Sequence, residues 1–240
     1  MAYAARTLVV ARGTLLVLTA FACSKEQAGT SDSIASQASP AASVAVAAPG
    51  RASTDSTKTL LFLGTSLTAG LGLDPEEAYP MLIQRKVDST RLAYRVVNAG
   101  VSGETSSGLL RRLDWLLQQR LDVIVIETGA NDGLRGVPVM AMRDNLQQII
   151  TRIRSAQPWA TIALIQMEAL PNMGRTYTES FQATFPDLAL RNQGVVLLPF
   201  LLDGVAGERD LNQGDGIHPN EQGERIVAAN VWKALKPLLR

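Results

Sequence analysis

The chain contains one histidine, His218, within the run Asp215-Gly216-Ile217-His218-Pro219-Asn220. Histidine is the side chain whose unperturbed pKa, about 6.5, lets it accept and return a proton near neutral pH. An aspartate three residues earlier could orient the imidazole and stabilise its cationic form. If the protein uses a histidine base, that base must be His218, and Asp215 is its candidate partner.

A serine that could use this base stands far upstream, where an apolar run ends in Gly64-Thr65-Ser66. A serine hydroxyl is a weak nucleophile until a base removes its proton, and it must project from a tight turn. Gly64 and Gly70 give the backbone freedom for such a turn. The alternative is that Ser66 belongs to an ordinary helix cap. The glycine spacing matches neither a P-loop nor a dinucleotide-binding motif.

Two further polar motifs follow apolar segments, at Asn98-Ala99-Gly100 and at Ala130-Asn131-Asp132-Gly133. The backbone N–H of Gly100 and the side-chain amide of Asn131 could donate hydrogen bonds to an oxyanion. One such donor typically lowers a barrier by about 3 kcal/mol. The alternatives are helix capping by Ser102 for the first motif and a simple turn for the second.

The elements that must bring these residues together follow an alternating pattern of apolar and amphipathic segments. Strands are predicted at residues 60–63, 94–98, 122–127, 161–166 and 195–198. Helices are predicted at residues 76–88, 105–119, 139–155 and 176–191, and from Pro219 to about residue 239. This order predicts a parallel sheet covered on both faces. Ligands bind such sheets at the carboxyl ends of the strands, where each motif falls.

Composition limits the possible classes of protein. The 240 residues are 46% hydrophobic, which suits one good-sized core. With 23 basic and 22 acidic residues in no long blocks, nucleic-acid binding is not expected. The balance favours a small or neutral partner. One histidine and one cysteine are too few for a zinc site. The oligomeric state is not indicated.

The N-terminus has the pattern of an export signal. Two arginines precede Leu15-Leu16-Val17-Leu18, and small residues then lead to Cys23, the only cysteine. The stretch is too short for a membrane-spanning helix. Residues 1–22 are therefore predicted to be a signal peptide. The residues before Cys23 resemble a bacterial lipobox, so Cys23 is the expected lipidated N-terminus. The alternative is ordinary signal-peptidase cleavage after Ala22.

Residues 24–57 are predicted to form a disordered tether. Of these 34 residues, 24 are Ala, Ser, Thr, Gly or Pro, which leaves little apolar surface to offset the entropy of ordering. The folded domain is expected at residues 58–240. The protein is expected in the periplasm, held at a membrane by its lipid. Ser24, where lipoproteins retained at the inner membrane carry Asp, favours the outer membrane.

Together the motifs resemble the blocks of the SGNH (GDSL-type) hydrolase superfamily. The matching positions are Ser66, Gly100, Asn131 and His218, with Asp215 as the triad acid. The resemblance covers nearly all of residues 58–240. It is closest to the bacterial arylesterase and acyl-CoA thioesterase–lysophospholipase branch, through Asp-Gly-Ile-His-Pro-Asn and the segment from Leu170 to Arg175. It implies a three-layer α/β/α sandwich with a five-stranded parallel sheet in the flavodoxin-like order 2-1-3-4-5.

The activity that this resemblance implies is hydrolysis of a carboxylic ester or thioester through an acyl-enzyme, without a cofactor. Ser66 would attack a small-molecule or lipid ester. The oxyanion would be held by the N–H groups of Ser66 and Gly100 and by the Asn131 amide. One position departs from the family pattern: Thr65 stands where Gly-Asp-Ser has aspartate. This departure bears on how tightly the turn is held.

The acyl group of the substrate is expected to lie against Leu170, Pro171 and Met173. The alternative is that these residues only close the core. Two rival functions stay open. A glycan O-acetyl esterase of the cell envelope would prefer acetylated sugars to longer acyl esters. A tethered binding module with an inactive site would not hydrolyse esters at all.

Overall fold

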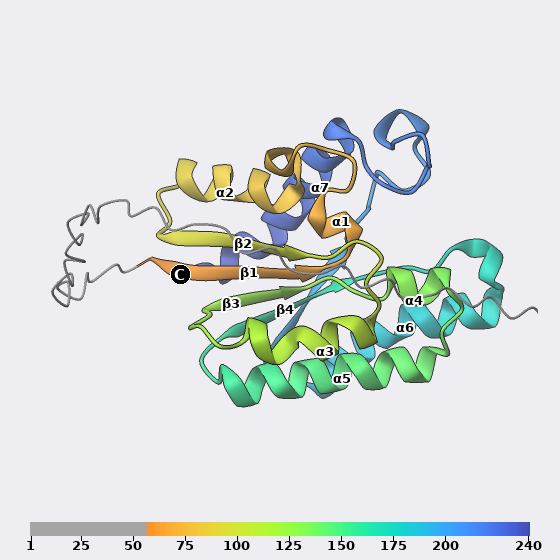
Figure 1. Cartoon of the computed structure of the whole chain (residues 1–240), viewed down its shortest axis with the longest axis horizontal. Helices are drawn as coiled ribbons and strands as arrows, with labels where there is room; N and C mark the ends of the chain where they lie inside the picture. The colour runs from red at the N-terminus through yellow and green to blue at the C-terminus, as the bar shows by residue number, and fades with distance from the viewer. Residues whose placement is uncertain (1–56) are drawn as a thin grey trace, which may run out of the picture. The chain divides into compact units, whose positions relative to one another are not determined.

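The computed structural model of the protein describes residues 57–240. The predicted signal peptide, Cys23 and nearly all of the predicted tether lie outside the described residues. A parallel sheet lies between two layers of helices, as predicted (Figure 1). Within residues 57–240, no helix is both long and apolar enough to cross a membrane.

The sheet has five parallel strands in the order β2-β1-β3-β4-β5, which confirms the predicted order. The strands are β1 (Lys58–Gly64), β2 (Tyr94–Gly100), β3 (Val123–Ile126), β4 (Thr161–Gln166) and β5 (Val195–Phe200). β1 from its second residue onward and all of β3 are buried, because helices cover both faces. Double coverage explains why these strands read as unbroken apolar runs.

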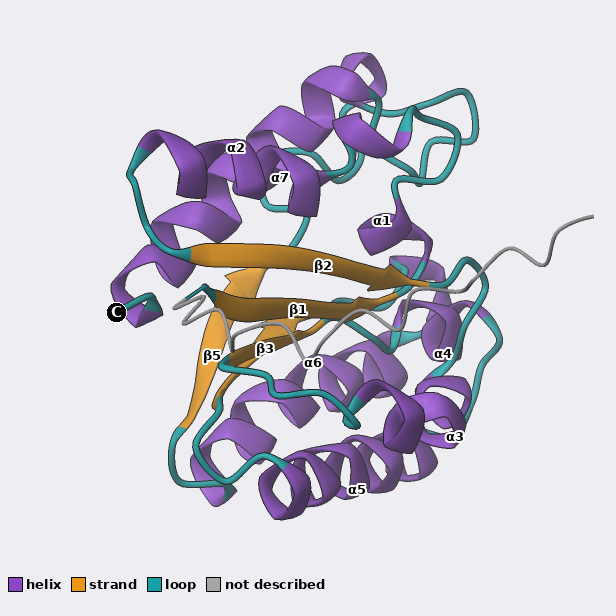
Figure 2. Ribbon diagram, turned by 60° about the vertical axis from the view of Figure 1, so that its left-hand side comes forward, coloured by secondary structure: helices purple, strands orange, loops and turns teal. Residues whose placement is uncertain are grey.

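The helices divide between the two faces of the sheet (Figure 2). One face carries α1 (Ser66–Ala69), α2 (Tyr79–Ser89) and α7 (Glu221–Leu235). The other carries α3 (Ser106–Leu116), α4 (Ala130–Leu134), α5 (Val139–Ala156) and α6 (Arg175–Arg191). Short 3₁₀ turns connect them: η1 (Pro75–Glu77), η2 (Pro171–Met173), η3 (Arg209–Leu211) and η4 (Lys236–Leu238).

The start of the last helix differs from the prediction. Asn220, and not Pro219, opens it, because the Asn220 side chain accepts hydrogen bonds from the N–H groups of Gln222 and Gly223. Asparagine is a strong N-cap residue, since its oxygen satisfies N–H groups that lack helical partners. Pro219 lies just before the cap and pairs with Asn212 in an isolated antiparallel bridge.

The segment predicted as one helix at residues 76–88 is broken at Ala78, whose backbone is extended. The 3₁₀ turn η1 precedes it, and α2 follows with Pro80 in its first turn. Tyr79, Leu82 and Ile83 are buried, so this side of α2 faces the core. Tyr79 packs edge to face against Phe62 of β1, with ring centroids 5.6 Å apart. This contact fixes α2 on the sheet beside α1.

Candidate active site

Ser66, His218 and Asp215 meet at the carboxyl-terminal edge of the sheet. Ser66 is the first residue of α1, two residues after the end of β1, and the other two lie on the loop between η3 and α7. His218 Nε2 lies 2.8 Å from Ser66 Oγ, and His218 Nδ1 lies 2.6 Å from Asp215 Oδ2. Both are hydrogen-bond distances. The predicted trio is therefore assembled as a connected chain of nucleophile, base and acid.

Asp215 is held as a carboxylate by several donors. Its Oδ1 accepts the N–H of Ile217 at 2.9 Å and that of His218 at 3.0 Å. The His218 side chain first, and these two N–H groups next, lower the pKa of Asp215 to about 2. Because Asp215 is ionised at neutral pH, it can fix the imidazole orientation and stabilise the imidazolium that forms during turnover.

The nucleophile turn, residues 65–68, projects Ser66 from a single turn of helix. Thr65 precedes α1 as its N-cap, and Gly70 ends α1 with a φ of +70°, donating its N–H to the Ser66 carbonyl. Gly64 is required by packing, since a Cβ there would lie 1.9 Å from Thr68 Oγ1. The side chain of Ser66 thus leaves the sheet edge at a fixed point, and the residue is only 8% exposed.

Gly100 does not have the predicted role of an oxyanion donor. Its N–H already donates to Asn98 Oδ1 at 3.0 Å, so it is not free for a ligand. Its importance is in packing, because a Cβ on Gly100 would lie 2.3 Å from the backbone nitrogen of Ala69 in α1. The missing side chain lets α1 pack directly on the end of β2.

Gly103, three residues further along, is the better candidate for this role. No hydrogen bond among residues 57–240 uses its N–H, and its φ is +77°. Val101 N–H donates to the Gly64 carbonyl at 2.9 Å, which holds this loop beside the nucleophile turn. The sequence contained a signal for this residue, because Ser102-Gly103 is a second turn-forming pair in the same motif.

Asn131 lies at the start of α4 and faces the same loop. Its Nδ2 donates to the carbonyl of Glu104 at 3.1 Å, one residue after Gly103. Gly129 is the N-cap of α4, with a φ of +108°. Asn131 is therefore part of a short helix rather than of the simple turn considered as its alternative. Its amide lies next to the loop that carries the free N–H of Gly103.

An ion pair ties this loop to β2. Arg112 binds both carboxylate oxygens of Glu104 with its Nε, at 2.8 and 3.0 Å, and its Nη2 donates to Glu104 and to the carbonyl of Ala99. The two side chains are only 22% and 10% exposed. Such a bidentate pair fixes geometry as well as supplying energy. The position of Gly103 is therefore well defined.

An apolar pocket of about 380 Å³ opens beside the trio. Its wall includes Leu67, Ala130 and Ile217, the sequence neighbours of Ser66, Asn131 and His218. The remaining lining residues are mostly apolar and include Leu134, Met167, Leu170, Pro171, Phe200 and Leu202. The pocket therefore lies next to the segments that carry the trio, and two of the three predicted wall residues, Leu170 and Pro171, line it.

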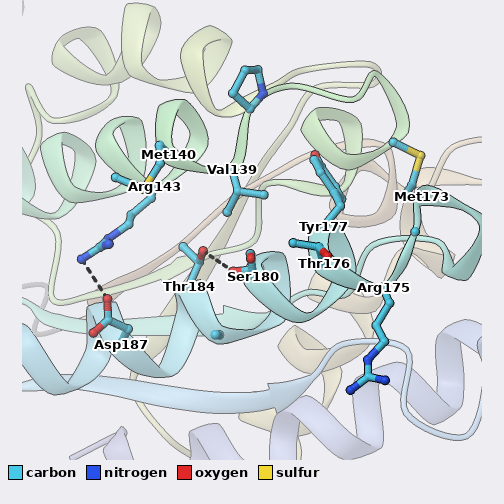
Figure 3. A pocket seen from close by; sticks show the side chains of 13 residues that line it. Val139, Met140, Arg143, Met173, Arg175, Thr176, Tyr177, Ser180, Thr184 and Asp187 are labelled. Carbon is cyan, nitrogen blue, oxygen red and sulfur yellow. Dashed lines mark hydrogen bonds and ion pairs between the residues drawn. The ribbon is translucent and has the colours of Figure 1, made fainter.

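Met173, the third predicted wall residue, lies elsewhere. It lines a larger cavity of about 870 Å³ between the start of α5 and α6, together with Tyr177, Arg143 and Asp187 (Figure 3). The 3₁₀ turn η2 explains the difference, because successive residues of a tight turn point in different directions. Neither the predicted catalytic residues nor their sequence neighbours line this larger cavity, so size alone does not mark the active site.

A serine, a histidine and an aspartate joined by two hydrogen bonds at the edge of a parallel α/β sheet define a site of the serine-hydrolase class. The chain belongs to the GDSL-like Lipase/Acylhydrolase family, whose model matches residues 62–226. This confirms the predicted relationship. Among residues 57–240, no group of three or more His, Cys, Asp or Glu side chains is arranged to hold a metal ion.

Individual relatives agree with this assignment. The chain is 39% identical over 183 residues to Esterase TesA of Pseudomonas aeruginosa, across 76% of this chain and 90% of that protein. It is 39% identical over 182 residues to Thioesterase 1/protease 1/lysophospholipase L1 of Escherichia coli K12, across 75% and 85%. Its structure is similar to that of psychrotrophic esterase EstA from Pseudoalteromonas sp., with a TM-score of 0.72 and 37% identity, across 76% and 98%.

Proposed function

We propose that the protein is a serine hydrolase of carboxylic esters and thioesters whose acyl group is apolar. The observation that carries this proposal is the chain of hydrogen bonds from Ser66 through His218 to Asp215 beside an apolar pocket. The names of the relatives, which include esterase, thioesterase and lysophospholipase, support the same reaction class.

The reaction begins when Ser66 Oγ attacks the substrate carbonyl and His218 Nε2 takes the hydroxyl proton. The oxyanion that forms would be held by the Asn131 amide and by the N–H groups of Ser66 and Gly103, which form no hydrogen bond among the described residues. His218 then returns the proton to the leaving alcohol or thiol. In the second half, His218 takes a proton from water as the water oxygen attacks the acyl carbon, and His218 then returns this proton to Ser66 Oγ as the acid leaves.

The pocket favours an acyl chain longer than acetyl. At its mouth, Leu134, Leu170 and Ile217 stay 44%, 42% and 40% exposed, and an apolar chain lying there would cover them. Burying apolar surface in this way is worth about 25 cal/mol per Å². The pocket volume is near the lower end of ordinary ligand sites, which span about 300–1,000 Å³. These features weigh against the glycan O-acetyl esterase alternative, whose acyl group would leave the pocket empty.

The intact site also weighs against an inactive binding module. His218 Nε2 lies 2.8 Å from Ser66 Oγ, within reach of the serine proton, and ligand binding alone does not require this arrangement. The hydrogen bond between His218 and Asp215 and the anionic state of Asp215 also favour proton transfer from Ser66 to His218.

We also propose that the enzyme is exported and lipidated at Cys23, with an outer-membrane destination. This proposal is supported by the signal-like residues before Cys23 and by the composition of residues 24–57. The test is membrane fractionation of the wild type and of Cys23→Ser, with mass spectrometry of the mature N-terminus. Lipidation predicts a diacylated or triacylated Cys23 in the membrane fraction. An unmodified thiol would overturn it.

The test of the reaction is hydrolysis of p-nitrophenyl esters from acetyl to palmitoyl, beside acyl-CoA and lysophospholipid substrates. We expect kcat/KM to rise from acetyl to chains that fill the pocket and then to level off or fall. Ser66→Ala is the control, and it should lose a factor of about 10⁶ in turnover. Activity confined to acetylated sugars would support the glycan esterase instead, and absence of turnover would support the binding module.

A further inference from the structure

A buried carboxylate that takes no part in the proposed reaction lies directly beneath the nucleophile turn. Glu127 follows β3 and is 0% exposed. Its Oε2 accepts the Thr65 N–H at 2.7 Å and the Thr68 hydroxyl at 2.8 Å, and the Thr65 hydroxyl lies 3.0 Å from both of its oxygens. Thr65 and Thr68 flank Ser66, so every hydrogen bond of this carboxylate goes to the turn that carries the nucleophile.

No basic side chain pairs with Glu127 among the ion pairs of residues 57–240. A buried acid without such a partner needs hydrogen-bond donors to remain ionised. Burial raises the pKa of Glu127, and the hydrogen bonds from Thr65 and Thr68 act in the opposite direction. The Thr65 N–H, the Thr65 hydroxyl and the Thr68 hydroxyl are all hydrogen-bond donors, and an ionised carboxylate can accept from all three.

The titratable groups that act on this site come from α2 and α7. The hydroxyl of Tyr79 lies 2.8 Å from Thr68 Oγ1, and since Thr68 gives its single proton to Glu127, Tyr79 must donate to Thr68. Glu224 of α7 accepts the N–H of Tyr79 at 2.8 Å. Burial raises the pKa of Glu224 to about 8, so this second acid is mostly neutral at pH 7.

We propose that Glu127 is a positioning residue that fixes the nucleophile turn, and that Thr65 is the donor that adapts this chain to it. The proposal rests on the proposed function, in which Ser66 is the nucleophile. By holding Thr65 and Thr68, the carboxylate keeps Ser66 Oγ in reach of His218. A misplacement of about 1 Å in such a group can cost a factor of about 10² in rate.

The identity of residue 65 follows from the same contacts. The family pattern of Gly-Asp-Ser would place a second carboxyl group against Glu127, and two carboxylates in contact must share a proton. A threonine at this place donates its hydroxyl instead. The turn in this chain is then held without a proton shared between two acids.

The central test compares Glu127→Gln with Glu224→Gln. Both changes replace a buried carboxyl group by an amide of the same shape, but only Glu127 contacts the nucleophile turn. We expect Glu127→Gln to lower kcat about 10- to 100-fold with KM within threefold. Labelling of Ser66 by a phosphonate probe should slow in parallel. Glu224→Gln should keep kcat within twofold. A folded Glu127→Gln variant with wild-type kcat would overturn the proposal.

Residue 65 supplies a second test that does not depend on the folding of Glu127→Gln. Thr65→Ser keeps the donor and should keep kcat, whereas Thr65→Val removes the donor and should lower kcat with little change in KM. Equal kcat values for the two would overturn the proposal. Thr65→Asp should add an ionisation to the pH profile of kcat that Thr65→Ser lacks, and an unchanged profile would count against proton sharing.

The control for the proposed function itself is Ser66→Ala. If Ser66→Ala keeps ester turnover, Ser66 is not the nucleophile and the proposed reaction fails. If Ser66→Ala is inactive while the Glu127 and Thr65 variants turn over at the wild-type rate, only the positioning role fails. The two failures are therefore distinguishable in one set of variants.

Discussion

The carboxylate of Asp132 accepts two hydrogen bonds from Ser106, one from its N–H at 2.8 Å and one from its hydroxyl at 2.6 Å. Asp132 is the residue after Asn131, and Ser106 is the first residue of α3. The pair fastens the short helix α4 to the start of α3. It thereby keeps the Asn131 amide facing the loop of Gly103.

Replacing Asp132 with Ala should destabilise the protein and weaken catalysis together. Buried charged hydrogen bonds contribute about 1.5–3 kcal/mol each, and the loss leaves the N–H and the hydroxyl proton of Ser106 without their acceptor. We expect the free energy of unfolding to fall by roughly 2–4 kcal/mol, measured by urea denaturation. Ser107→Ala, a change at the neighbouring half-buried residue, is the control and should cost much less. Equal losses for both variants would show that the link is unimportant.

Asn131→Ala should lower kcat by about 10²–10³ and leave KM nearly unchanged if, as we propose, the amide acts on the developing oxyanion. Steady-state kinetics on one p-nitrophenyl ester checks this. A rise in KM with unchanged kcat would instead make Asn131 a substrate-binding residue.

Alanine at the two glycines of the β2 motif should have different effects. Gly100→Ala places a Cβ 2.3 Å from the Ala69 nitrogen, so we expect its main effect to be a lower thermal stability. At Gly103 the nearest atom to a Cβ is 3.6 Å away, in Arg135, but the φ of +77° is strained for alanine. Alanine keeps the N–H but its strain should move this N–H away from the oxyanion, so we expect Gly103→Ala to fold and to have a lower kcat. Thermal unfolding and kinetics on both variants separate the two roles, and a fully active Gly103→Ala would contradict an oxyanion contact.

Asp215→Asn should lower kcat by about 10⁴, as expected when the group that orients a triad histidine is lost. The fold should persist, because Asn can still accept the N–H groups of Ile217 and His218. Circular dichroism and kinetics on purified protein check both points. A loss of less than tenfold would mean that another group orients the imidazole.

Stability should fall as the pH rises from about 5 to 8 because of Glu224. Its pKa is about 8 in the folded protein against 4.5 ordinarily, so in this range the folded state holds a proton that the unfolded state releases. The resulting decrease in the free energy of unfolding is on the order of 1–4 kcal/mol, since one pKa unit corresponds to about 1.4 kcal/mol. Urea unfolding at pH 5 and 8 should show a smaller drop for Glu224→Gln than for the wild type. Glu221→Gln, an exposed change on the same helix, should show the wild-type drop, and identical drops for all three would contradict the assignment.

Much of the fold could be predicted from the sequence, because its central strands are buried on both faces and contain unbroken apolar residues. The helices α1 and α4, which carry Ser66 and Asn131, could not be predicted, because their four and five residues are too few to show a helical period. The trio was recognisable because the only histidine limits the choice of base. The sequence did not show which glycine has a free N–H, because this depends on the side chain of Asn98, which accepts the N–H of Gly100.

The role of Glu127 was hidden for a similar reason. From the sequence, a glutamate at the end of an apolar strand would be interpreted as the first solvent-exposed residue after the strand. Its partners Thr65 and Thr68 lie 62 and 59 residues earlier, and only the folded sheet brings them together.

The nucleophile follows the first strand and the base precedes the last helix, 152 residues later. A chain that has not yet docked its final segment therefore holds a serine without a partner and cannot hydrolyse anything. Activity appears only on completion of the whole domain, which makes ester turnover a sensitive gauge of correct folding. It also means that proteolytic loss of the segment from Asp215 onward would remove both the base and its acid while leaving more than four-fifths of the domain behind.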